Sequence, residues 1–234
     1  MSPHSIFIFI IASFEEPAYR HFIKMRKLQL AKYSIPHKFL FDAPCPFDYV
    51  PDLNDIFYEK PQPPFPIKVP NPELNPHMIL KFIKALKLPD FNPTKYEFIL
   101  RVNLSTFINF PSLFKLLPTL PTSRCCAGHT ALINAFSQKL KLLSGAAQIF
   151  TPDFILWIQN NIEIDNPILY MNNDDIVISY LIDQQQLSII TIPLVYNRQN
   201  TNAVLIRLKT LADRKKDTES WKWLLKEVDN IEIT

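Results

Sequence analysis

The chain has 234 residues, enough for one sizeable domain, and a composition of 47% hydrophobic and 20% charged residues argues against disorder. Its 25 basic and 22 acidic side chains leave a net charge of +3, which is too small to indicate nucleic-acid binding. Only two glycines, Gly128 and Gly145, are present, so the glycine-rich phosphate loops of P-loop and dinucleotide-binding enzymes are excluded.

The cysteines and the first apolar run predict a soluble, cytoplasmic protein. Cys45, Cys125 and Cys126 are odd in number and two are adjacent, which offers no disulfide framework and fits a reducing compartment. No Cys/His cluster indicates structural zinc. The apolar run at residues 6–12 is too short to span a bilayer, and no Lys or Arg precedes it. We therefore expect a buried strand there, without a transmembrane segment or signal peptide.

The first part of the chain is predicted to form two strands, a helix and a proline-rich connection. Residues 5–12 are the first strand, and a helix opens at Pro17, where the missing N–H costs nothing, and runs to about Tyr33. A second strand follows at 38–41. Ten of the 21 prolines lie within residues 44–76, so this stretch cannot be helix or central sheet and is predicted to be a long surface connection.

After this connection the pattern continues to alternate between helices and strands. The predicted elements are a helix at 78–88, a strand at 97–102, a short helix from Pro111, a strand at 141–150, a helix at 152–160 capped by Thr151, a helix from 173–175, strands at 187–193 and 204–208, and a last helix around 221–228.

This alternation predicts a single α/β domain over residues 1–234, with a mainly parallel central sheet covered by helices on both faces. The C-terminal stretch 204–234 supplies a basic strand and a helix. In such sheets ligands bind beyond the C-terminal ends of the strands. Asn103-Leu104-Ser105 lies at one of these ends.

Five stretches of the chain carry a resemblance to a known family. In chain order they are "IASFEEPAYRHFIKMRKLQL", "PHMILKFIKAL", "YEFILRVNLSTFINFPSLFKLL", "LLSGAAQIFTPDFILWI" and "NNDDIVISYLI". Together they resemble the β-1,3-galactosyltransferase and Fringe group of GT-A glycosyltransferases, over most of residues 5–195. The Asn-Leu-Ser form is also similar to glycosyltransferase-like proteins of large DNA viruses, which would place the protein in the cytoplasm of an infected host cell.

The resemblance implies a GT-A, Rossmann-like fold and an inverting hexosyltransferase. Such an enzyme would move a sugar from a nucleotide-sugar donor, typically a UDP-sugar in this family, to a hydroxyl of a glycan or glycoprotein acceptor. It would not bind nucleic acid.

The resemblance also places Asn103 and Ser105 at the family's acidic triplet, which holds a divalent cation against the donor diphosphate. Carboxylates suit Mn²⁺ or Mg²⁺, whereas an amide and a hydroxyl bind such cations weakly, so a metal site is not predicted and cation use stays open. Both side chains can still hydrogen-bond a donor. Arg207, Lys209 and Arg214 could replace the cation, because arginine matches phosphate geometry. The alternative is a solvated basic edge strand and helix start.

Asp175 is the predicted catalytic base, on the match to the family's acidic pair. A carboxylate within hydrogen-bond reach can take the proton of an attacking acceptor hydroxyl. Asp174 is predicted to cap the helix and support its neighbour. On the residues alone, helix capping explains both side chains, and the assignment between the two stays open.

Five further residues are predicted to bind the donor, each with a structural alternative. Ala12 and Ser13 end the first strand, where the nucleoside would lie, or they simply precede a helix. Lys81 reaches a phosphate, or snorkels from an apolar helix. Arg101 contacts the nucleotide, or pairs with an acid such as Glu97. Gly145 marks a close backbone approach to a ligand, or a bulge.

Two other functions are weighed against the transferase. One is a non-catalytic module that binds nucleotide sugars or glycans and has lost the acidic metal motif. The other is a Rossmann-like methyltransferase, which the sequence disfavours because the first turn, "IASFEEP", has no glycine.

Overall fold

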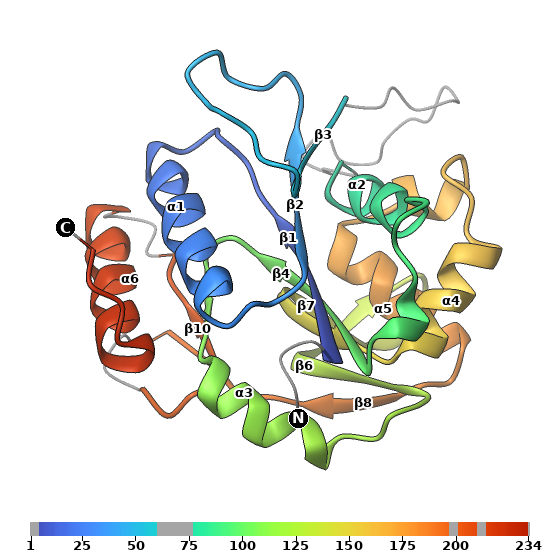
Figure 1. Ribbon diagram of the computed structural model, residues 1–234. Helices are drawn as coiled ribbons and strands as arrows, with labels where there is room; N and C mark the ends of the chain where they lie inside the picture. The colour runs from blue at the N-terminus through green and yellow to red at the C-terminus, as the bar shows by residue number, and fades with distance from the viewer. Residues whose placement is uncertain (1–4, 60–76, 197–200, 210–213, 234) are drawn as a thin grey trace.

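A seven-stranded sheet runs through the computed structural model, which describes residues 5–59, 77–196, 201–209 and 214–233 (Figure 1). Its strand order is β3-β2-β1-β4-β7-β6-β8. The first four of these are parallel, β7 is antiparallel to both of its neighbours, and β8 is parallel to β6. The strands are β1 (Ile6–Ile11), β2 (His37–Asp42), β3 (Asp55–Tyr58), β4 (Phe98–Asn103), β6 (Cys125–Ala135), β7 (Gln138–Phe150) and β8 (Ser188–Thr191).

Helices cover both faces of this sheet, as the alternating sequence pattern predicts (Figure 1). One apolar core packs α1 (Pro17–Lys32), α3 (Phe110–Leu116) and α6 (Arg214–Asp229) against one face. The other packs α2 (His77–Leu86), α4 (Pro152–Asn161) and α5 (Asp174–Gln184) against the opposite face. All six residues of β1 are buried, with Ile8 in the first core and Phe9 in the second. A strand buried on both faces is apolar throughout, which explains the continuous run at residues 6–12.

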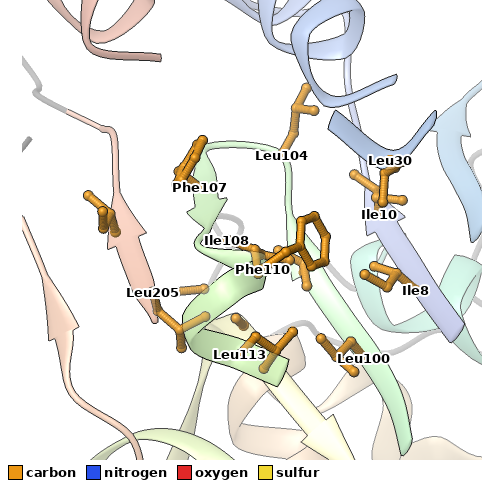
Figure 2. Close-up of a cluster of buried hydrophobic side chains, with 14 of the residues drawn as sticks. Ile8, Ile10, Leu30, Leu100, Leu104, Phe107, Ile108, Phe110, Leu113 and Leu205 are labelled. Carbon is orange, nitrogen blue, oxygen red and sulfur yellow. The ribbon is translucent and has the colours of Figure 1, made fainter. Parts of the chain in front are cut away.

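A second, three-stranded sheet brings the C-terminal region to the end of β4. Its order is β5 (Thr106–Ile108), β10 (Leu205–Arg207) and β9 (Leu194–Val195). Because β5 follows β4 after a two-residue turn, the antiparallel pairing of Leu205 with Ile108 anchors β10 beside that turn. Figure 2 shows Leu205 and Ile108 in the apolar cluster that also holds Leu104 and Phe107.

The expected helices and strands are all present, with three corrections. The stretch 44–76 is not only a connection, because β3 forms at the edge of the sheet, next to β2; residues 60–76 lie outside the described part. The short β5 and the long β6 were not predicted, since "TFI" is brief and "CCAGHTALINA" mixes small and polar residues. Thr151 occupies the N-cap position of α4, as predicted, but its side chain makes no cap hydrogen bond among the described residues; its hydroxyl donates to the Cys125 carbonyl over 3.0 Å.

Within the residues that the structure describes, no helix is long and apolar enough to cross a membrane.

Candidate functional site

A cleft of about 510 Å³ opens beyond the C-terminal ends of β1 and β4. The second sheet and the starts of α1 and α5 complete its walls. The predicted site residues in its lining are Ala12, Ser13, Lys81, Asn103, Ser105, Gly145, Asp174, Asp175, Arg207 and Lys209. Asn103 and Asp175, which the family resemblance assigns to donor binding and to catalysis, therefore line the same hollow.

Asp175 lies in the first turn of α5, where β7 passes close to the helix. Its carboxylate accepts a hydrogen bond from the Ile176 N–H over 3.0 Å. A Cβ added to Gly145 would lie 3.5 Å from the Asp175 Cβ and 3.3 Å from a carboxylate oxygen of Asp174. Gly145 is thus a point of close backbone approach to the acidic pair. Burial raises the pKa of Asp175, and the charge of Asp174 raises it further, while Arg101 lowers it.

Arg101 and Asp174 form a buried ion pair directly beneath the cleft. Arg101 is 0% exposed and Asp174 is 4% exposed, and the guanidinium also donates to Gln148 Oε1 over 3.1 Å. Two predictions for Arg101 are corrected. Arg101 pairs with Asp174 instead of Glu97, and it lies below the cleft instead of lining it. Asp174 is inside the helix and makes an ion pair, so it is not the cap; Asn173 occupies the N-cap position.

Asn103 ends β4 with its side chain at the cleft. Its Oδ1 atom is buried and has no hydrogen-bond partner among the described residues. A buried acceptor without a partner is costly, so this atom is suited to accept a hydrogen bond from a ligand. Ser105, 3% exposed, follows at the same turn.

The side chains at this turn are weak ligands for a metal ion, and the described acids do not add a cluster to them. Within the described ranges, no three side chains of the types His, Cys, Asp and Glu gather closely enough to hold a metal ion. Asn103 and Ser105 are themselves poor ligands for hard cations. We therefore assign no chemical step to a cation.

Of the three basic residues that were predicted to replace the cation, Arg207 and Lys209 line the cleft. Arg207 ends β10, the central strand of the small sheet and not an edge strand, and donates to the neutral Thr106 hydroxyl over 3.0 Å. Burial lowers the pKa of Arg207, but an arginine remains charged. Lys209 is exposed at the cleft. Within the described parts of the chain, neither makes an ion pair with a carboxylate, so both charges are available to an anion.

Arg214 does not line the cleft. Its guanidinium pairs with Glu16 at 2.5 Å and with Asp217. It lies over the rings of Tyr19 and Phe22, 5.2 and 5.5 Å from their centroids. Arg214 therefore closes the wall of the cleft through Glu16 and Tyr19, which do line it.

Lys81 connects the ends of β1 and β2. The ammonium group donates to the Ala12 carbonyl over 3.1 Å and to Asp42 over 3.2 Å, and its residue is 3% exposed. Burial lowers the pKa of Lys81, and Asp42 opposes this shift. Lys81 is therefore not a snorkelling lysine. Ser13 bends the chain here, since its hydroxyl accepts a hydrogen bond from the Glu15 N–H over 3.0 Å.

Seven polar residues of the cleft were also missed by the prediction: Glu15, Glu16, Tyr19, Asp42, Ser144, Asn173 and Tyr196. Asp42 had a usable signal, because it ends a parallel strand like Asn103 does. Ser144 and Asn173 adjoin residues that were predicted. Tyr196 carries no local signal, because only the pairing of β9 with β10 brings it to the cleft.

No protein-family model and no curated protein matches the sequence. The structure is similar to that of a glycosyltransferase involved in the glycosylation of the major capsid of PBCV-1, with a TM-score of 0.50 and 9% identity over 92% of this chain and 98% of that one. It also matches 2-C-methyl-D-erythritol 4-phosphate cytidylyltransferase from Thermus thermophilus, with a TM-score of 0.44 and 11% identity over 94% of this chain and 99% of that one. At such identities the likeness to the PBCV-1 enzyme is one of fold. The closer resemblance to the Fringe group stays a prediction.

Proposed function

We propose that this protein is a glycosyltransferase that moves a sugar from a nucleotide-sugar donor, in the first instance a UDP-sugar, to a hydroxyl group of a glycan or glycoprotein. The observation that carries the proposal is the shared cleft at the C-terminal strand ends. It holds the Asp175 carboxylate, the Asn103 amide oxygen, which has no partner among the described residues, and the positively charged side chains of Arg207 and Lys209. The fold of the PBCV-1 glycosyltransferase is consistent with this proposal.

Asp175 would act as the general base in a single displacement at the anomeric carbon. As the acceptor oxygen forms its bond to that carbon, the bond from the carbon to the phosphate oxygen breaks, and Asp175 takes the acceptor proton. The nucleoside diphosphate leaves with the electron pair of the broken bond. Attack from the face opposite the leaving group inverts the anomeric carbon. The raised pKa of Asp175 makes it a stronger base than an exposed aspartate.

Arg207 and Lys209 would stabilise the charge of the departing diphosphate. A preorganised cation that is already in place needs no reorganisation when that charge develops. Arg207 is held by a neutral hydroxyl, and no carboxylate among the described residues neutralises its charge. The buried Oδ1 atom of Asn103 would accept a hydrogen bond from a hydroxyl group of the nucleotide sugar.

The direct test is the release of UDP from a panel of UDP-sugars, measured with and without Mn²⁺. Asp175→Asn should lower kcat by about a hundredfold or more, in the range of general-base removal. Asp183→Asn is the matched control, because Asp183 is an exposed aspartate on the same helix, bonded to Gln138 at 3.1 Å. Turnover that persists in Asp175→Asn would remove the base role.

Calorimetry of UDP binding in EDTA tests the role of the basic residues. We expect affinity to survive EDTA and to fall in Arg207→Ala, because the protein's own cations would hold the diphosphate. Loss of affinity in EDTA would instead assign that role to a divalent ion.

The replacement of the acidic triplet by Asn103 and Ser105 favours one alternative, a non-catalytic module that binds a nucleotide sugar or glycan. Tight donor binding without turnover of any donor would support that alternative.

A further inference from the structure

A closed ring of hydrogen bonds lies beneath Asp175 and connects β4, β7 and α5. Arg101 donates to Asp174 and to Gln148, and Gln148 Nε2 donates to the Leu143 carbonyl over 2.8 Å. The Leu143 N–H donates to Ser179 Oγ over 2.8 Å, and that hydroxyl donates to the Asp175 carbonyl over 2.6 Å. The ring begins at Asp174 and ends at Asp175, and the bond between these adjacent residues closes it.

The ring fixes an irregular part of β7. Gly128 pairs with Gln148 and Thr130 pairs with Leu143, so residues 144–147 of β7 stand opposite a single residue of β6. Such a bulge redirects the chain, and here it brings the Gly145 backbone so close to α5 that a Cβ added there would lie 3.5 Å from the Asp175 Cβ. Side chains of the ring bind both the N–H and the carbonyl of Leu143, at the start of the bulge.

Burial makes the ring sensitive to the loss of any member. Arg101, Gln148 and Ser179 are each 0% exposed. In such surroundings a polar group that loses its partner cannot turn to water, so the remaining groups must move or stay unsatisfied. A change in the ring should therefore reach Asp175, although Arg101, Gln148 and Ser179 do not line the cleft.

We propose that Arg101, Gln148 and Ser179 are positioning residues, which hold the bulge of β7 and the start of α5 so that the Asp175 carboxylate faces the acceptor hydroxyl. This inference rests on the proposed function. The charged groups around Asp175 agree with it. Arg101 from β4 lowers its pKa, Asp174 from α5 raises it, and the Gly145 N–H from β7 lowers it.

Ser179→Ala tests the proposal with a closely matched control. Ser179 and Ser220 are both buried helical serines whose hydroxyls donate to the carbonyl four residues earlier, at 2.6 and 2.7 Å. Ser179 Oγ differs in that it also accepts a hydrogen bond from the Leu143 N–H. Ser179→Ala should lower kcat by about tenfold to a hundredfold, the effect of a small misplacement, with the donor KM changed less than about twofold. Ser220→Ala should leave both constants unchanged. Equal kinetics in the two variants would overturn the proposal.

A second readout does not depend on turnover. The ¹³C carboxyl signal of Asp175, identified by its loss in Asp175→Asn, can be titrated by NMR. Arg101→Met removes a nearby positive charge, so the titration should move to higher pH, whereas Arg101→Lys keeps the charge and should move it less. An Asp175 titration that is unchanged in Arg101→Met would overturn the proposal. If the wild type releases no UDP from any donor, the proposed function fails, and the titration alone still decides whether the ring controls Asp175.

Discussion

Loss of one partner of the Arg101–Asp174 pair should destabilise the whole fold. Both residues are almost fully buried, so Arg101→Met removes the counter-charge of a buried carboxylate at the floor of the cleft and also removes the donor to Gln148. Breaking a buried pair in this way costs about 3–5 kcal/mol. For a chain of this size each kcal/mol lowers Tm by about 2–4 °C, so a fall of roughly 6–20 °C is expected.

Urea unfolding of a double-mutant cycle measures this cost. In Arg101→Met/Asp174→Leu no charge is left behind, and replacing both ions by apolar side chains is often neutral or stabilising. The double variant should therefore be more stable than Arg101→Met alone. Trp221, which is fully buried, provides the fluorescence signal. The reasoning is refuted if Arg101→Met unfolds within about 1 kcal/mol of wild type, or if the two single losses simply add.

An exposed pair of the same chemistry serves as the control. Arg20 and Asp48 lie 2.6 Å apart, with side chains 45% and 46% exposed, and the guanidinium also lies 5.8 Å from the centroid of the Phe14 ring. Because solvent screens this pair, Arg20→Met should shift the urea midpoint far less than Arg101→Met.

Three further predictions concern the core and the pH dependence of folding. Gly128→Ala should lower the free energy of unfolding by about 1–3 kcal/mol, because the new Cβ would lie 2.6 Å from a backbone carbonyl oxygen. Gly145→Ala, with a nearest contact of 3.3 Å, should lower it less, and equal urea midpoints for the two variants would contradict this. Trp221→Ala should cost about 3–5 kcal/mol, since the side chain is fully buried, and Trp223→Ala, at a site 37% exposed, should cost far less in the same assay. Burial raises the pKa of Asp229, so the native state holds the proton of this carboxyl group more tightly than the unfolded state does. The stability that Asp229 contributes therefore falls as the pH rises from about 4 through the raised pKa. Asp229→Asn should remove that fall, and parallel pH profiles of unfolding free energy for the two proteins would disprove it.

Local patterns in the sequence were sufficient for the layers of the fold. The apolar run of β1, the proline that opens α1 and the helical spacing of α2 each reflect burial or backbone geometry within a few residues. The end of β4 could be recognised as a ligand site for the same reason, because parallel strands end together at one edge of a sheet. Asn103 and Asp175 were placed in one cleft on this basis and on family resemblance.

Pairing between distant residues was decided by the tertiary structure alone. Arg101 and Asp174 are 73 residues apart, and Arg101 could as well have met Glu97, since a sequence lists charges without saying which will share a buried space. Arg207 reaches the cleft only because β10 pairs with β5, a strand too short to carry a periodic signal. The bulge of β7 likewise depends on side chains from three elements. Periodicity records how deeply each residue is buried, whereas the choice of partner follows from register and packing across the whole chain.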